Sequence, residues 1–559
     1  MSGALERFVD RYYRRRPVNA TFTGVHTYDH QLPDWSPLAL AALDDEMDTL
    51  SAELSAAHPA ALSARAYRDD ADLLDAELAR AFLEIQRAEN ATVHSVRGNP
   101  SLWTGEAIFS VIALMIRDFA PLEARIEAAA ARLDAIPGFF AQAAETLGHT
   151  ALSPHWTAKA MRECAGALLL LDVGIRKWLT SGAPTPAVAG RCLAAAAHAR
   201  VAFEQFILWL RDRPPAPDAT MACGPELYDV LLARGHQCRQ SRAGLLAEAR
   251  QRFAEERDRL DTMARDTVGS WRAAQAHLAA DHPTPGAYLD TFTRTWAACR
   301  ECANSNDVVT WPEWPIRYAP FPAWTRDAAP YLYYLHYRSP APFDPYRVYD
   351  YVVPSLPEEA RAAETHLRAW NTSVIKLNHV VHHGAVGHHV QNWHAYHRAP
   401  SRIGRIAAVD CASRIGMFCG GTMAEGWACY ATGLMEELGF LSPIERVSEQ
   451  HSRVRVLARA IVDIELHQGT MSFEGAVQFY TDRVDMSPDA ARAEAVKNSM
   501  FPCTAVMYWL GTQGILDLRE TVRSKRGSRF SLKEFHDELL GYGSIPVPFV
   551  ARMMGAGDA

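Results

Sequence analysis

The sequence has little of what marks disulfide-rich, membrane-spanning or nucleic-acid-binding proteins. Its 559 residues include only 10 cysteines, too few for a disulfide scaffold, which favours reduced thiols and a cytoplasmic location. The longest apolar run, at 165–175, is interrupted by Asp172, so no membrane span is predicted. The formal net charge of −8 argues against a nucleic-acid partner. The first residues, MSGALERFVDRYYRRRP, are charged and lack the apolar segment of a secretory signal.

Alternating β-branched runs are scarce as well, and apolar residues recur at helical spacing, so we expect a mainly α fold. Ile126, Leu133 and Ile136 form one such stripe, which Pro137 and the glycine after it are expected to end. A second long amphipathic helix is predicted at 241–264.

Three serines stand where helices are expected to begin. Ser355, Ser442 and Ser531 are each followed three residues later by glutamate, the pattern of a capping box. These positions predict helix starts in the last third of the chain.

Residues 308–353 differ from the rest, being rich in proline, tryptophan and tyrosine. We expect a small sheet here, with strands at 308–310 and 331–335. An aromatic packing loop and the wall of a substrate pocket are equally compatible with this composition. In the second case Arg317 and Arg338 are candidate anchors for an anionic substrate. The composition divides the chain into a helical region at 1–300, an insert at 301–355 and a helical region at 356–559.

The most informative segment is 377–397, which holds seven of the 22 histidines. They are His379, His382, His383, His388, His389, His394 and His397. Imidazole binds zinc and several other transition metals, so this density favours a metal or acid–base site over a merely polar helix face.

The spacing of these histidines leaves the ligand pair open. On a regular helix His382 and His389 are two turns apart on one face. Gly384 and Gly387, however, weaken the helix between them, and a widened turn would let His382 meet His388 instead.

A carboxylate ligand is expected from another helix. Glu425 stands among small residues in an apolar stretch, where a carboxylate needs a cation or hydrogen-bond donors. A salt bridge with an arginine is the alternative.

These segments resemble the bacterial domain-of-unknown-function family 885 (DUF885), of the zincin-like metallopeptidase clan. The family signature is H-E-x-x-P-G-H-H-x-Q followed by E-G-W-A-x-Y, and this chain has H-H-G-A-V-G-H-H-V-Q at 382–391 and E-G-W-A-C-Y at 425–430. Further similar segments are P-V-N-A-T at 17–21, the stretch 459–467, Y-W-L-G at 508–511 and G-S-I-P at 543–546.

The resemblance implies a gluzincin-like multi-helix fold with a small β or irregular insert. It implies one divalent metal ion held by His382, His388 and Glu425, with zinc as the preferred ion and iron or manganese as alternatives. His379 and His389 are alternative ligands. The family's glutamate, the general base of such enzymes, is His383 here, which could accept a proton itself or bind the metal.

Other catalytic and binding candidates carry less support. Tyr508 is a candidate donor to an oxyanion, and Asp463 could orient His467 in the shell around the ligands. Arg519 is a candidate for a substrate carboxylate. For each, helix packing or an ordinary ion pair is the alternative.

The sequence thus predicts a metalloenzyme that hydrolyses an amide or peptide-like bond in a small-molecule or peptide-like substrate, with no nucleic-acid or membrane partner. The alternative is an iron or manganese enzyme doing redox or rearrangement chemistry at the same ligands. A binding protein that has lost its activity is the least favoured hypothesis, because an inactive site need not keep two histidines and Glu425.

Overall fold

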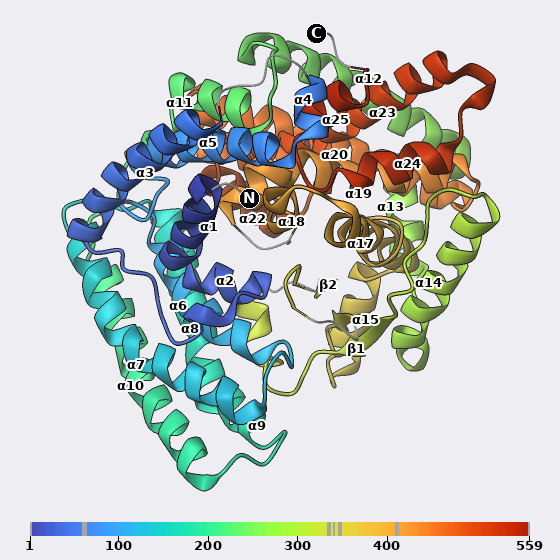
Figure 1. Ribbon diagram of the computed structural model, residues 1–559. Helices are drawn as coiled ribbons and strands as arrows, with labels where there is room; N and C mark the ends of the chain where they lie inside the picture. Colours follow the sequence, from blue (N-terminus) through green and yellow to red (C-terminus); the bar gives the residue numbers. More distant parts are fainter. Residues whose placement is uncertain are drawn as a thin grey trace.

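Helices form almost the whole molecule, as the mainly α prediction requires (Figure 1). The computed structural model describes residues 3–58, 64–332, 337–338, 341–344, 349–408 and 413–556, without the side chains of 64–65, 337–338 and 349. In this described part, no helix is both long enough and apolar enough to cross a membrane.

The first part of the chain is helical, and two of its long helices, α7 and α10, lie side by side along one edge of Figure 1. Its α-helices are α1 (Gly3–Arg15), α2 (Pro17–Thr23), α3 (Pro37–Ala57), α4 (Ala64–Asp69), α5 (Ala71–Asn90), α6 (Pro100–Met115), α7 (Leu122–Leu147), α8 (Pro154–Leu169), α9 (Ile175–Leu179), α10 (Pro186–Arg211), α11 (Pro225–Val230), α12 (Arg242–Val268), α13 (Trp271–Ala280) and α14 (Tyr288–Ser305). Shorter 3₁₀ and π turns are η1 (His26–Tyr28), η2 (Leu170–Gly174), η3 (Asp218–Met221), η4 (Leu231–Gly235) and η5 (Pro285–Ala287).

A second set of helices follows the sheet and carries the histidine segment. It comprises α15 (Ala360–Ala369), α16 (Thr372–Val374), α17 (His388–Arg398), α18 (Arg402–Ile406), α19 (Gly421–Glu437), α20 (Pro443–His467), α21 (Phe473–Val484), α22 (Pro488–Met500), α23 (Met507–Arg526), α24 (Leu532–Gly541) and α25 (Val547–Met553). Its π-helices are η7 (Ile375–Gly384) and η8 (Gly416–Gly420), and η9 (Gly527–Arg529) is a 3₁₀ turn.

The helix boundaries test the sequence reasoning in detail. Helix α12 begins directly after Ser241, whose side chain caps it, and α20 begins with the predicted capping box of Ser442. Ser531 caps α24, but Ser355 caps no helix, because α15 begins later with Glu359 as its N-cap.

The predicted break at Pro137 is wrong, since α7 continues through it to Leu147. The helix lies against α6 and α10, and its apolar face, with Ile136 and Ala143, is fully buried on both sides of the proline. Burial of this face outweighs the one hydrogen bond that proline removes.

The small sheet exists, but its strands differ from those predicted. It has the order β1-β3-β2, with β1 (Ile316–Pro320) parallel to β3 (Tyr349–Val353) and β2 (Tyr337–Arg338) antiparallel to β3. Residues 308–310 form no strand, because their backbone groups bond to the side chains of Asp537, His394 and His536 instead. Tyr331 ends the 3₁₀ turn η6 (Ala329–Tyr331), and 333–335 lie outside the described residues.

Three hydrophobic cores hold the helices together, and they cross the boundaries predicted near residues 300 and 355. One core runs from α1 through β3 to α25 and contains Trp427. Another joins α6, α7, α8 and α10 to Trp324 and Leu332 of the insert. The third connects α12 with α20 and α21. The division into three regions is therefore one of composition, and the regions share their packing.

Helices α19 and α23 touch backbone to backbone. A side chain at Gly511 would lie 1.9 Å from the Thr422 carbonyl oxygen, and one at Gly426 would lie 2.4 Å from the Gly511 backbone. Glycine at both positions is thus required for the approach that fixes Glu425 relative to α23.

We expect Gly511→Ala to lower the free energy of unfolding by about 1–3 kcal/mol, because the new methyl group overpacks this contact. Urea unfolding followed by circular dichroism measures it. Gly433→Ala in α19 is the matched control: its nearest neighbour would be the end of the Arg453 side chain at 3.4 Å, so the usual helix preference for alanine should make it neutral or stabilising. Equal effects of the two substitutions would contradict the close packing.

Candidate metal centre

A break in the histidine segment brings its two halves together. The π-helix η7 ends at Gly384, the backbone turns through Ala385 and Gly387, and α17 begins at His388. A side chain at Gly387 would lie 1.8 Å from the His382 carbonyl oxygen, so only glycine fits this turn. The predicted widening of the helix is present as the π-helix η7, and a break at Ala385 and Gly387 follows it.

The break places His382, His383 and His388 in one group whose potential ligand atoms all lie within 4.8 Å of one another. The His382 and His388 rings are 5.0 Å apart and nearly perpendicular. Glu425 projects from α19 toward the same point, with its Oε2 3.4 Å from His382 Nε2 and 3.7 Å from His388 Nε2. These four residues are the candidate metal centre.

Trp427 ties α19 to the break. Its Nε1 donates to the Val386 carbonyl at 2.8 Å and to the Gly387 carbonyl at 3.2 Å, and its ring is fully buried. Two residues after Glu425, it therefore fixes the carboxylate relative to the histidines. The sequence analysis named Trp427 only as part of the E-G-W-A-C-Y motif. Its structural role could have been suspected, because a buried indole N–H needs an acceptor.

The charge state of the centre follows from these contacts. Burial raises the pKa of Glu425, but hydrogen bonds with His382 and His388 outweigh it and hold that pKa well below its usual range. Burial, followed by the neighbouring His382 and His388, lowers the pKa of His383 well below its usual range. The centre thus combines an ionised carboxylate with a neutral third imidazole.

The orientation of His383 is set by its backbone partner. Its Nδ1 lies 2.6 Å from the Asn378 carbonyl oxygen, which only a protonated nitrogen can satisfy. In the neutral ring, Nε2 is therefore the nitrogen with a lone pair.

The remaining histidines of the segment contact other groups. His379 Nδ1 is 2.6 Å from the Tyr351 hydroxyl, and its ring stacks on Trp370. His389 Nε2 lies 3.3 Å from the Trp314 carbonyl oxygen. Both were alternative ligands, and the structure groups neither with His382, His383 and His388.

Asp463 and His467 lie in a separate buried network at the start of α23. The Asp463 carboxylate accepts from the backbone N–H groups of Cys503 and Val506, each at 3.1 Å. His467 Nε2 lies 2.8 Å from the Asn498 carbonyl oxygen and 3.8 Å from Asp463. Burial raises the pKa of Asp463 to about 7 and lowers that of His467 to about 4. The predicted contact exists, but it anchors the 502–506 turn.

The arginines named from the sequence are held in ion pairs. Arg519 binds Glu437 at 2.6 Å and donates to the Tyr430 hydroxyl, and Arg317 binds Asp350 at 2.8 Å on an exposed strand. Arg519 thus has the ion pair that was its alternative, and a substrate-binding role for Arg519 or Arg317 stays a prediction. The side chain of Arg338 lies outside the described residues.

The aromatic insert lies against the histidine segment. A side chain at Gly384 would meet the Tyr318 hydroxyl at 2.3 Å, and Trp314 packs on His389 and His397. Trp324, by contrast, belongs to the core of the first helical layer. Tyr351 of β3 also contacts the segment, through His379 and His383. That the insert faces a substrate stays a prediction.

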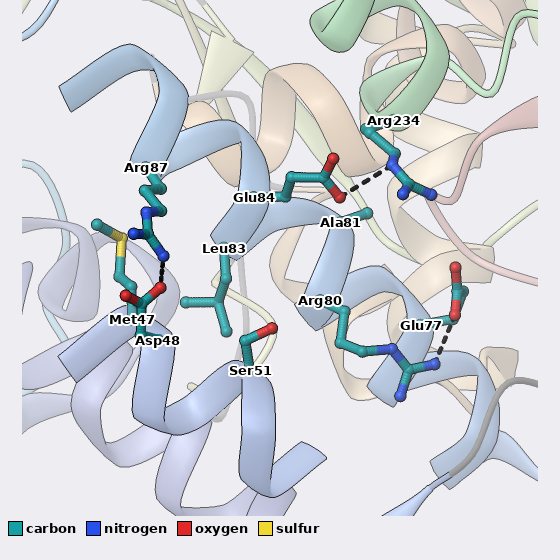
Figure 2. A pocket seen from close by; sticks show the side chains of 10 residues that line it. All are labelled: Met47, Asp48, Ser51, Glu77, Arg80, Ala81, Leu83, Glu84, Arg87 and Arg234. Carbon is teal, nitrogen blue, oxygen red and sulfur yellow. Dashed lines mark hydrogen bonds and ion pairs between the residues drawn. The ribbon is translucent and has the colours of Figure 1, made fainter. Parts of the chain in front are cut away.

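A surface hollow of about 250 Å³ lies elsewhere, between α3, α5 and η4. Figure 2 shows three arginines around it, each directed at a carboxylate: Arg87 at Asp48, Arg234 at Glu84 and Arg80 at Glu77. Each of these three arginines is therefore neutralised by a carboxylate of the protein.

We expect Trp427→Phe to lower the free energy of unfolding by about 1–3 kcal/mol, because it keeps a buried ring but leaves the two carbonyl oxygens of the break without their donor. Urea unfolding measures it. Trp393→Phe, on the half-buried side of α17, is the control and should change stability little. If both variants unfold at the same urea concentration, the hydrogen bonds of the Trp427 indole to the break do not contribute to stability.

Comparison with known proteins gives the family. No curated protein matches the sequence. The structure is similar to a candidate lipoprotein of unknown function from Shewanella oneidensis (TM-score 0.75, 20% identity, 99% of this chain and 98% of that one). It is also similar to a candidate lipoprotein from Colwellia psychrerythraea (TM-score 0.80, 17% identity, 99% and 97%). The model of the family of bacterial proteins of unknown function, DUF885, matches residues 17–554, and this chain belongs to that family.

Proposed function

We propose that the protein is a metal-dependent hydrolase of amide or peptide-like bonds, with His382, His388 and Glu425 as ligands of one divalent metal, zinc first. The observation that supports this most is the convergence of two imidazole nitrogens on one oxygen of an ionised carboxylate. In the zincin-like clan that the sequence resembles, such a centre cleaves peptide bonds.

The spacing of the donor atoms fits a metal ion. Ligands bound tetrahedrally at about 2.0–2.1 Å are about 3.3 Å from one another. The 3.4 Å and 3.7 Å separations between Glu425 and the two histidines are close to that value. Two histidines and one carboxylate also leave a coordination position open, as catalytic zinc sites do.

When bound, a dication supplies a water of lowered pKa and polarises a carbonyl group. The chain supplies the proton acceptor: His383, neutral and held through Nδ1 by the Asn378 carbonyl, directs its second nitrogen to the same group of ligand atoms. This position is occupied by glutamate in the family signature. An imidazole can take over its proton transfer without adding negative charge to the centre.

Tyr508 is the proposed donor to the developing oxyanion. Helices α19 and α23 run in parallel, since Gly421 meets Met507 and Gly426 meets Gly511. Tyr508 therefore lies within about one turn of Glu425 along the helix pair. A tyrosine hydroxyl at this level can donate to a substrate carbonyl oxygen.

Metal analysis tests the centre and separates the two reaction classes. Protein purified without added metal should contain about one equivalent of zinc, and chelation should abolish hydrolysis of N-acyl dipeptides until zinc is restored. Iron in place of zinc, with activity that requires dioxygen, would support the redox alternative and overturn the hydrolase.

We expect His388→Ala and Glu425→Gln each to lower metal affinity at least about 10-fold, because each removes a charged or aligned ligand. Competition with a metal-sensitive dye measures it. His397→Ala is the control, since His397 is exposed on α17 and bonds to the Trp393 carbonyl oxygen. Full metal occupancy in Glu425→Gln would show that the ligand set is wrong.

We expect His383→Ala to keep the metal and to lower kcat/KM by about 10²–10⁴-fold, the usual contribution of a general base. Dipeptide hydrolysis and metal content are measured on the same preparation. Loss of metal would make His383 a ligand, and wild-type activity would remove it from the mechanism.

A further inference from the structure

A basic cluster of Arg455, Arg459 and Lys497, gathered around Glu494, lies beside Tyr508. Arg459 binds Glu494 through two parallel contacts, Nε to Oε1 at 2.7 Å and Nη2 to Oε2 at 2.9 Å. The Arg459 guanidinium also lies 5.2 Å, and the Lys497 ammonium 5.9 Å, from the centre of the Tyr508 ring. Three cations thus share one carboxylate.

Within the described part of the chain, Arg455 is the member of the cluster that makes no ion pair of its own, although the Glu494 charge, which Arg459 binds, lies close to it. It lies one turn before Arg459 on the same face of α20, half-buried, and among the described residues its guanidinium makes no hydrogen bond or ion pair. Burial first, and then the charge of Arg459, lower the pKa of Arg455. Keeping a cation here is unfavourable, and a second anion would relieve it. The arginines of the hollow in Figure 2, in contrast, each have their own carboxylate.

Helix α19, which carries Glu425 and Cys429, packs against both α20 and α23. Cys429 follows Glu425 by one turn of α19, and burial together with the Glu425 charge raises the pKa of its thiol while Arg459 lowers it. Cys429 is therefore within electrostatic reach of both Glu425 and Arg459. Each of Arg455, Arg459, Glu494, Lys497 and Tyr508 keeps part of its surface exposed.

We infer that Arg455, with Arg459 and Lys497, binds a carboxylate of the substrate, so that the enzyme acts on peptide-like molecules with a free carboxylate near the cleaved bond. This inference rests on the proposed hydrolase and adds its substrate class. Carboxylate is the anion that the cluster already holds, since Glu494 occupies the fork of Arg459 in bidentate geometry. The fork of Arg455 offers a second such place one turn along the helix.

The test compares the binding of N-acetyl-Ala-Ala, which has a free carboxylate, with that of its C-terminal amide, by isothermal titration calorimetry on the purified protein. The wild type should bind the acid at least about 10-fold more tightly. Arg455→Gln should remove this preference, and Arg455→Lys should keep part of it. Arg446→Gln, on the exposed side of the same helix, is the matched control and should leave it unchanged.

Equal affinity for acid and amide in the wild type, binding of neither, or an unchanged preference in Arg455→Gln would overturn the inference. Its failure is distinct from that of the hydrolase. Hydrolysis of both peptides at equal rates would remove only the carboxylate site. Preferential binding of the acid without hydrolysis, in metal-replete protein, would remove only the proposed reaction.

Discussion

The candidate centre depends on one interruption of the helix, at Ala385 and Gly387. On a continuous α-helix His382 and His388 point in different directions, because six residues are not a whole number of turns. The π-helix η7 and the break after it remove that constraint and let their rings meet. The contact is possible only because Gly387 has no side chain to collide with the His382 carbonyl.

The elements around this break all restrain it from different sides. Trp427 binds its carbonyl groups from α19, and Trp296 of α14 donates to the Gly384 carbonyl at 2.7 Å. The Tyr318 hydroxyl of the sheet lies against Gly384. From the C-terminal end, Gln391 bonds to Ser544. Segments that are distant in the sequence therefore meet around the break and restrain the candidate ligands.

The same packing distributes charge between two parts of the site. The histidine side carries the anionic Glu425 among imidazoles, and the α20 side carries an excess of arginine and lysine next to Tyr508. Helix α19, pressed on α23 by facing glycines, separates and aligns them. Under the proposed function, a substrate whose carbonyl is polarised on the histidine side and whose carboxylate binds on the α20 side would contact both parts at once.

The sequence by itself determined the helical class, the capping of α20 and α24, and the identity of the histidine and glutamate motifs, because periodicity, caps and motifs are local properties. The strand positions and the continuation of α7 through Pro137 depended on contacts with distant segments, which outweigh local preference. Tertiary structure also decided which histidines converge, since His389 turns to the Trp314 carbonyl while His388 faces Glu425. The partner of Arg519 could not be predicted either, because an ion pair forms across helices that the sequence does not place side by side.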